Sequence, residues 1–390
     1  MKRSALAVLF LTVFIDLLGF GIVLPLLPRY AEDYLAGDVT IGLLMASFSF
    51  MQLLFAPFWG RLSDRYGRRP ILMVGLFGSI LSYALFGLAR SVTLLFVSRI
   101  AAGIFGATIG TAQAYIADVT GSKDRGKQMA LIGAAFGLGF TFGPALGGLA
   151  HHHLGRAAPG FLAAGFSLVA FLMAWRTLPE PERHEKRGPH VRFDATALRH
   201  AFATRTIPLI LALQIVATLA FASFEGTLAR FTDRKWGYNP AENGLIFTYV
   251  GFCLLLSQGF LVRRFMPRVG ELNFTVAGTI LLAMGFVGVA LAPGTVAALA
   301  TLPVVVTGFS MITPSLASLL SLRSPRSMQG EILGIGQSGL SLARILGPFA
   351  GNVLFLTSPE APYWFAAGVM GFAFLGAIVL RRAPAPPVAS

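Results

Sequence analysis

Long apolar runs recur along the whole chain, and short polar or Gly- and Pro-containing segments separate them. A helix that crosses a bilayer needs about 20 mostly apolar residues. The sequence contains twelve runs of this kind, at 5–27, 40–60, 70–89, 92–116, 128–150, 157–175, 206–230, 241–262, 271–292, 295–320, 330–355 and 361–380. The pattern therefore predicts an all-α membrane protein with twelve transmembrane helices.

One longer polar stretch divides these runs into two sets of six. We expect an N-terminal six-helix bundle at 1–176, a cytoplasmic linker at 177–205 and a C-terminal six-helix bundle at 206–390. The two halves repeat, because Gly143-Pro144-Ala145-Leu146-Gly147 in the fifth run matches Gly347-Pro348-Phe349-Ala350-Gly351 in the eleventh. Repeated halves predict two pseudo-symmetric bundles with a binding site between them, near the middle of the bilayer.

Composition and charge agree with a membrane protein. The chain is 55% hydrophobic and 12% charged, whereas soluble domains carry about 25% charged residues. Its net charge of +14 is explained by Lys and Arg in loops on one side of the membrane, which predicts cytoplasmic termini and no nucleic-acid partner. The single cysteine, Cys253, excludes a disulfide within the chain and a cysteine-built metal site. We interpret the first run as a retained helix, not a cleaved signal peptide.

Two acids interrupt apolar runs. Asp16 lies near the middle of the first run, and Glu225 lies in the seventh, on one helical face with Gln214, Thr218 and Phe221. A carboxylate inside a membrane span is costly unless it faces water, a partner or a proton pathway. Asp16 and Glu225 are therefore candidates for proton coupling, although Glu225 lies toward the outer end and is alternatively a solvated residue at the mouth.

Two cations also lie inside the runs. Arg99 shares a helical face with Gly103, Gly106, Gly110 and Gln113. We expect Arg99 at the depth of Asp16, where pairing would lower the cost of both charges. The alternative is an arginine that extends to the outer interface. For Arg344 in the eleventh run, contact with an acidic substrate and structural pairing both remain open.

The segment Gly60-Arg61-Leu62-Ser63-Asp64-Arg65-Tyr66-Gly67-Arg68-Arg69 lies between the second and third runs. It resembles the signature loop of the major facilitator superfamily at nearly every position. The resemblance implies that Asp64 docks at the start of the eleventh helix, near Gln329–Ile332, and that Arg68 pairs with Asp118. The implied conformational latch of the outward-facing state is formed by Gly60, Asp64, Arg65, Gly67, Arg68, Arg69 and Asp118.

Three further motifs resemble the drug/proton antiporters of that superfamily. Gly139, Gly143, Pro144, Gly147 and Gly148 fit the antiporter motif of the fifth span, although simple helix packing is the alternative. The segment Leu18–Pro28 resembles the first-helix motif of the twelve-helix group. The segment Phe96–Gly103 resembles the fourth-span motif, but Ala102 stands where glutamine is usual.

The resemblance covers essentially the whole chain and is closest to the twelve-helix drug/proton antiporters, the group of the tetracycline-efflux pumps. It implies a monomeric inner-membrane protein that exports small lipophilic or amphipathic compounds in exchange for protons, by alternating access and without a cofactor. The alternative is a transporter of one metabolite, with its direction undetermined. We expect the substrate cavity to be lined by Phe20, Phe48, Gln52, Gln113, Gln214, Phe221, Phe247, Met311, Gln337 and Arg344.

Other functional classes receive no support from the sequence. We interpret His151-His152-His153 as an ordinary polar loop, because three adjacent residues do not converge easily on one metal ion. The sequence has no Walker A motif and no catalytic triad or cluster of metal ligands. We therefore expect neither ATP-driven transport nor enzymatic activity.

Overall fold

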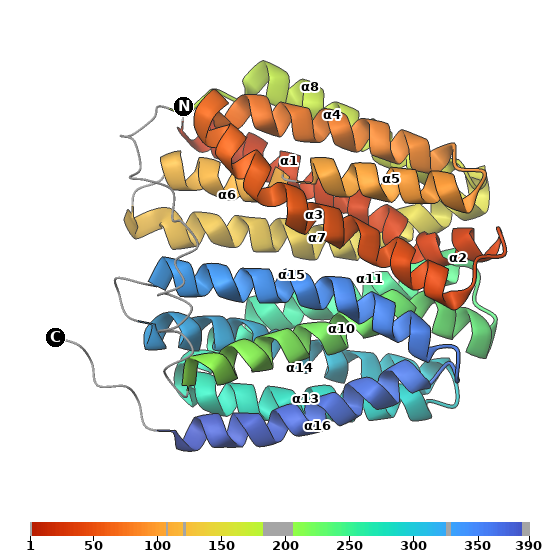
Figure 1. Cartoon of the computed structure of the whole chain (residues 1–390), viewed down its shortest axis with the longest axis vertical. Coiled ribbons are helices and arrows are strands. Elements are labelled where there is room, and N and C mark those ends of the chain that lie inside the picture. Colours follow the sequence, from red (N-terminus) through yellow and green to blue (C-terminus); the bar gives the residue numbers. More distant parts are fainter. Residues whose placement is uncertain (1, 107, 120–121, 182–205, 325–328, 384–390) are drawn as a thin grey trace. The chain divides into compact units, whose positions relative to one another are not determined.

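A computed structural model describes residues 2–106, 108–119, 122–181, 206–324 and 329–383, and the side chains of 2–6, 108–109, 117, 122–134, 136 and 329–331 lie outside that description. Every regular element in this part of the chain is a helix (Figure 1). The first half contains α1 (Lys2–Val23), η1 (Leu24–Leu26), α2 (Leu27–Glu32), α3 (Asp38–Tyr66), α4 (Arg68–Gly87), α5 (Val92–Phe105), α6 (Thr108–Val119), α7 (Ser122–Leu154) and α8 (Ala158–Thr177). The second half contains α10 (Thr206–Trp236), α11 (Pro240–Leu256), η2 (Ser257–Val262), α12 (Arg263–Val269), α13 (Glu271–Leu291), α14 (Thr295–Arg323), α15 (Gln329–Leu354) and α16 (Ala361–Arg382).

The helices follow the apolar runs. Among the described residues, ten helical stretches are long and apolar enough to cross a membrane. Two more helices, α7 and α15, occupy the expected fifth and eleventh runs. The helical membrane fold predicted from the apolar pattern is confirmed.

Two of the expected spans are interrupted. The fourth consists of α5 and α6, which separate near Gly106, and the Gln52 amide donates to the Gly106 carbonyl oxygen at 2.9 Å. The eighth passes from α11 through the π-helical turn η2 into α12. Arg263, Arg264 and Arg268 lie on α12.

The described residues form two compact units. Unit 1 draws on Met1–Lys186 and Leu228–Phe252, and unit 2 on Arg187–Thr227 and Cys253–Ser390. The C-terminal part of α10 and most of α11, which were expected in the C-terminal bundle, thus cluster with unit 1. The greater part of the expected linker, 182–205, lies outside the described residues.

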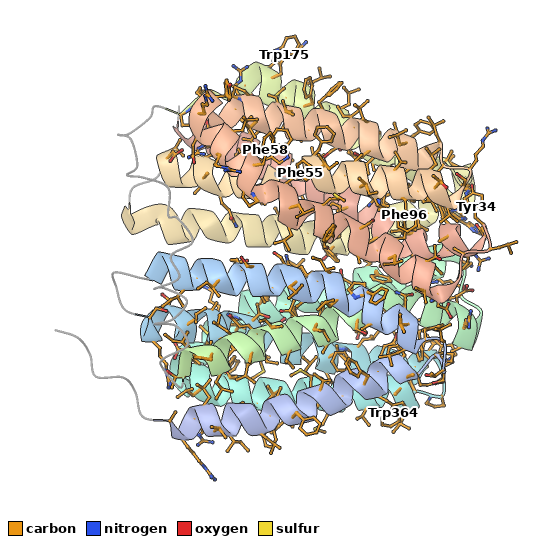
Figure 2. The ribbon with its side chains drawn as sticks, in the orientation of Figure 1. Tyr34, Phe55, Phe58, Phe96, Trp175 and Trp364 are labelled. Atoms are coloured by element: carbon orange, nitrogen blue, oxygen red, sulfur yellow. The ribbon has the colours of Figure 1, made fainter. Side chains whose placement is uncertain are left out.

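Each unit has an apolar interior and apolar side chains on its outside. In unit 1, Ile22, Leu44 and Phe86 are buried in one cluster. On the outside, Phe58, Trp175 and Trp364 are 45%, 58% and 46% exposed, and Figure 2 shows Trp175 and Trp364 pointing away from their helices. Exposed aromatic side chains on membrane-length helices suit contact with lipid.

Candidate functional site

The signature segment, Gly60–Arg69, is mostly helical. Gly60–Tyr66 end α3 and Arg68 begins α4, so Gly67 is the one residue between the two helices. The expectation of a loop over this whole segment is therefore wrong, because α3 continues through the polar residues that follow its apolar run. Gly67 has φ of 111°, a backbone conformation that glycine adopts without strain.

Arg68 is the centre of this segment. Its Nε lies 2.8 Å from Asp118 Oδ2 and its Nη1 lies 2.5 Å from Asp64 Oδ1, and Nη1 also donates to Ser63 Oγ at 2.6 Å. The expected pairing of Arg68 with Asp118 is present. The expected docking site of Asp64 is Gln329–Ile332. Of these residues, only Ile332 has a described side chain.

The other members of the predicted latch have varied surroundings. Arg65 lies over the ring of Tyr66, with its guanidinium carbon 5.4 Å from the centroid. Arg69 Nη2 donates to the Trp175 carbonyl oxygen at 2.5 Å. An added Cβ at Gly60 would meet no atom within 4 Å, so packing does not require glycine at this position.

Glu180 is a functional candidate that the sequence analysis missed. Its Oε1 accepts from the backbone N–H of Arg68 at 2.6 Å, and its Oε2 accepts from that of Arg69 at 2.9 Å. The Tyr115 hydroxyl holds the neighbouring Pro179 carbonyl at 2.7 Å. Free N–H groups and the positive end of the helix dipole favour a carboxylate at the start of α4. The sequence signal that could have identified Glu180 is its position, as an acid directly after the end of the sixth span.

We expect Glu180→Ala to lower the free energy of unfolding by about 1–2 kcal/mol, because the first N–H groups of α4 lose their acceptor. Glu180→Gln should cost less, since an amide oxygen still accepts one hydrogen bond. Thermal unfolding of the purified protein in detergent measures both changes. If both variants unfold at the wild-type temperature, the carboxylate does not stabilise this helix end.

Asp16 lies on the side of α1 that faces α4. The Ser79 hydroxyl donates to Asp16 Oδ1 at 2.9 Å, and the Tyr83 hydroxyl points at the Asp16 backbone carbonyl at 3.4 Å. The Tyr83 ring is packed against Gly19, where an added Cβ would lie 2.8 Å from a ring carbon. Asp16 is partly buried and lies inside the helix packing of unit 1. Ser79 and Tyr83 share a helical face, which was the sequence signal for this pair.

Arg99 is buried close to this site. Its side chain extends from α5 over the Phe86 ring, with the guanidinium carbon 5.6 Å from the centroid, and the residue is 2% exposed. Its Nε and Nη2 have no hydrogen-bond partner among the described residues, so these two nitrogens do not make the expected pairing with Asp16. Tyr83 has both Asp16 and Arg99 as electrostatic neighbours. A polar group, Tyr83, thus lies near both charges.

The antiporter motif packs α7 against α1. An added Cβ at Gly139 would lie 2.8 Å from Leu17, one at Gly143 would lie 2.8 Å from Gly21, and one at Gly147 would lie 2.4 Å from the Ile22 carbonyl oxygen. Contacts this short leave no room for side chains, so these glycines let the two backbones approach closely.

An adjacent face of α7 packs against α11. An added Cβ at Gly148 would lie 2.4 Å from the Pro240 carbonyl oxygen, and one at Gly244 would lie 2.4 Å from the Pro144 carbonyl oxygen. Gly143 and Gly148 therefore belong to different faces, and the motif joins α7 to two helices. These contacts support the packing interpretation of the motif.

The helix pair α10 and α15 in unit 2 repeats the arrangement of α1 and α7. An added Cβ at Gly347 would lie 2.7 Å from the Leu219 carbonyl oxygen, and one at Gly351 would lie 2.5 Å from Ser223 Oγ. Gly347 and Gly351 are the counterparts of Gly143 and Gly147. The internal repeat of the sequence is thus visible as a repeated helix–helix contact.

Glu225 and Arg344 lie close to this second contact. Each is the charged group that acts electrostatically on the other, although no Glu225–Arg344 ion pair within 4.0 Å occurs among the described residues. Glu225 is partly buried and Arg344 is exposed. For the structural-pairing alternative of Arg344, the structure supplies an acidic neighbour, Glu225.

The expected cavity residues fall into three groups. Phe20 lies beside Phe48, with ring centroids 5.1 Å apart, and Gln113 is exposed. Gln214 and Gln337 line a cavity of about 110 Å³ in unit 2, and Phe221 lies near it. Phe247 and Met311 are only 3% and 6% exposed, and Met311 packs with Val262 and Phe274. Neither Phe247 nor Met311 lines this cavity in unit 2.

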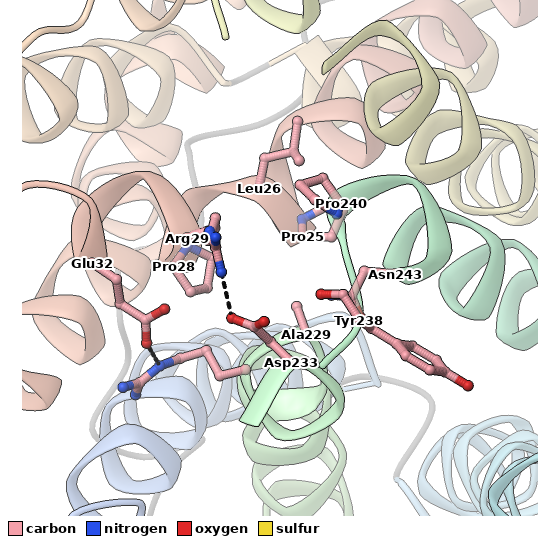
Figure 3. Close-up of a pocket in the computed structure, with 11 residues that line it drawn as sticks. Pro25, Leu26, Pro28, Arg29, Glu32, Ala229, Asp233, Tyr238, Pro240 and Asn243 are labelled. Atoms are coloured by element: carbon pink, nitrogen blue, oxygen red, sulfur yellow. Dashed lines mark hydrogen bonds and ion pairs between the residues drawn. The ribbon is translucent and has the colours of Figure 1, made fainter. Parts of the chain in front are cut away.

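A second group of charges involves α2, the start of α3 and the C-terminal part of α10, at the end of α3 away from the signature segment. We call Arg29, Glu32, Asp38, Arg230 and Asp233 the distal cluster. Arg230 Nε lies 2.6 Å from Glu32 Oε1, and its Nη2 also pairs with Asp38. Arg29 Nη1 lies 2.7 Å from Asp233 Oδ2 (Figure 3). The void among these side chains measures about 10 Å³, which is room for one water at most.

The distal cluster explains why part of α10 belongs to unit 1. The Arg230 side chain is 1% exposed and joins α10 to the C-terminal end of α2 and the start of α3. An arginine with two carboxylate partners is held far more firmly than a loop cation.

The histidine run has a local structural role. His151 Nδ1 lies 2.9 Å from the Tyr30 hydroxyl, which donates to the Arg156 carbonyl oxygen at 2.6 Å. All three histidines lie in the last turn of α7, so the expected polar loop is helical. Among the described residues, no group of three or more His, Cys, Asp or Glu side chains is placed to hold a metal ion.

Comparison with known proteins identifies the family. Residues 9–348 match the model of the Major Facilitator Superfamily. Over 386 residues, 98% of each chain, the sequence is 30% identical to multidrug resistance protein 1 of Bacillus subtilis. It is 28% identical to the class B tetracycline resistance protein of Escherichia coli, over 97% of this chain and 95% of that protein.

A solved structure agrees with the sequence comparisons. The human organic anion transporter MFSD10 superposes with a TM-score of 0.73 at 26% identity, over 96% of this chain and 99% of that one. The match includes the helices that carry Asp16, Arg68, Glu225 and Arg344. The chain belongs to the major facilitator superfamily.

Proposed function

We propose that this protein exports small lipophilic or amphipathic compounds in exchange for protons, by alternating access. The relatives named for multidrug and tetracycline resistance support export of such compounds. The observation that carries the proton exchange is Asp16, a carboxylate on an apolar membrane-length helix that accepts a hydrogen bond from Ser79 at 2.9 Å. An acid at this depth is expensive to keep and is usually functional.

Two acids are available to bind protons. Asp16 belongs to unit 1 and Glu225 to unit 2. Tyr83 lies near both Asp16 and Arg99, and Arg344 is the charged neighbour of Glu225. Binding a proton at either acid removes a charge and changes the balance between conformations. Exchange follows if proton and substrate favour different conformations.

Two charged groups are suited to hold alternative conformations. Arg68 with Asp64 and Asp118 fixes the signature segment at the C-terminal end of α3, and the distal cluster joins the other end of α3 to α2 and α10. We assign the signature segment to the cytoplasmic side of an inner membrane, with both termini cytoplasmic, because most loop cations lie on that side. The distal cluster then faces outward, and its ion pairs must separate for α10 to move away from α2 and α3. The protein works as a monomer in the bilayer on this proposal.

Transport of an anionic metabolite is the second candidate. Arg344 is exposed within unit 2, and an accessible guanidinium suits a carboxylate or phosphate. The human relative of known structure is named an organic anion transporter. This candidate uses the same fold with a different cargo.

Accumulation in inside-out membrane vesicles tests the proposal. With an acidic interior, we expect tetracycline and a quinolone to accumulate, and a protonophore to abolish that accumulation. Each proton exchanged against one pH unit sustains roughly a tenfold concentration ratio. Accumulation of p-aminohippurate alone would establish the second candidate instead. Accumulation of none of the three above the level of vesicles without the protein contradicts proton-driven export of this class.

A further inference from the structure

The cavity of unit 2 is enclosed by α10, α14 and α15. Its polar lining consists of Gln214 and Thr218 from α10, Thr313 from α14 and Gln337 from α15. Among the described residues, no charged side chain lines it. Its volume of about 110 Å³ is several times the roughly 10–15 Å³ that one water needs. It is smaller than the about 300–1,000 Å³ of a whole drug site, so it fits one part of a larger molecule.

The side-chain oxygen of Gln214, Oε1, lacks a hydrogen-bond partner in this cavity among the described residues. The residue is 7% exposed. A buried amide oxygen without a partner costs about 1–3 kcal/mol. Gly336 leaves room beside this atom, since an added Cβ there would lie 3.5 Å from it. A buried acceptor facing an empty space indicates that a donor from outside the chain completes it.

A second acceptor lies on the facing helix. The Thr313 hydroxyl donates a hydrogen bond to the Phe309 carbonyl oxygen at 3.1 Å. Its oxygen can therefore still accept a hydrogen bond. Glu225 lies eleven positions further along α10 than Gln214, which is about 16 Å along a helix. A cation is therefore not favoured in the cavity, whereas a neutral N–H or O–H group is.

An aromatic surface lies next to the cavity. Phe221 is one turn from Thr218 along α10, and Phe309 is one turn from Thr313 along α14. Their rings stack with centroids 3.9 Å apart and planes 7° apart, and both residues are partly exposed. Stacked rings provide a flat apolar surface, which suits an aromatic ring system.

We propose that this cavity is the subsite for a neutral hydrogen-bond donor of the substrate, such as a carboxamide or phenol, attached to a flat aromatic core that packs near Phe221 and Phe309. The inference rests on the proposed export function and defines its substrate class. The donor binds Gln214 Oε1, and the core lies between this subsite and Glu225.

Binding of tetracycline, which has a flat ring system with carboxamide and hydroxyl donors, tests the subsite. In the purified protein without a pH gradient, we expect Gln214→Leu to weaken binding roughly three- to tenfold, the value of one neutral hydrogen bond. Gly336→Ala should also weaken it, because the added methyl group takes space beside Gln214. Gln258→Leu, the same chemical change at an exposed position on η2, should leave binding unchanged.

Unliganded stability separates a ligand site from a structural role. Gln214→Leu should unfold at the wild-type temperature or above, because it removes an unsatisfied buried acceptor. Wild-type affinity in Gln214→Leu, or no tetracycline binding by the wild type, overturns the subsite. Such a result leaves proton-driven export intact if other compounds still accumulate in vesicles, so the two proposals fail separately.

Discussion

Asp16→Asn is expected to abolish substrate accumulation driven by a pH gradient. Asparagine keeps the size of the side chain and an oxygen that accepts from Ser79, so the packing of α1 against α4 should persist. It cannot take up or release a proton, so the gradient no longer drives transport. For each proton exchanged, the wild type should sustain an inside-to-outside substrate ratio on the order of tenfold per pH unit across inside-out vesicles. In Asp16→Asn this ratio should be unity.

Exchange of labelled for unlabelled tetracycline at equal pH should survive in Asp16→Asn, because exchange requires no net proton movement. Ser79→Ala should reduce coupled transport without abolishing it, since only one hydrogen bond to the carboxylate is lost. Glu242→Gln is the matched control, with the same loss of charge at an exposed acid. Undiminished accumulation by Asp16→Asn would show that Asp16 is not the required carrier.

The second large effect is expected from Arg230→Ala. This change leaves Glu32 and Asp38, which are 24% and 14% exposed, without the guanidinium that pairs with both. Removing one partner of a buried ion pair costs about 3–5 kcal/mol, because the remaining charges are uncompensated. We expect a correspondingly lower unfolding temperature of the protein in detergent.

Arg29→Ala provides the matched comparison at the same end of the helices. Its pair with Asp233 involves side chains that are 47% and 26% exposed, and an exposed pair contributes about 1 kcal/mol or less. Arg230→Lys should recover part of the stability by restoring the charge. Equal, small losses in Arg230→Ala and Arg29→Ala would contradict a central role for Arg230 in the distal cluster.

Several features were predictable because their physical cause is local. Membrane-length apolar runs specify the helices, and the repeated Gly-Pro segments specify the close contacts of Gly143 and Gly347. The pairing of Arg68 with Asp118 was also expected, from the resemblance of the signature segment. The helices and the close glycine contacts follow from patterns within short stretches of sequence, whereas the pairing of Arg68 with Asp118, fifty positions apart, followed only from the resemblance.

Other features depend on which helices become neighbours, and a single sequence does not reveal this. Ser79 and Glu180 acquire their roles from partners more than sixty positions away. Arg230 gains its role only from Glu32 and Asp38, which packing places beside it. Gly60–Tyr66 were assigned to a loop by polarity, whereas backbone hydrogen bonding continues the helix.

Proton movement driven by substrate is the most direct test of the central claim. Liposomes containing the purified protein, tetracycline and an internal pH indicator are diluted into drug-free buffer. We predict that drug leaving through the protein acidifies the interior, and that Asp16→Asn shows no acidification beyond that of protein-free liposomes. Equal acidification with the wild type, with Asp16→Asn and without protein would contradict the claim that this chain exchanges protons for its cargo at Asp16.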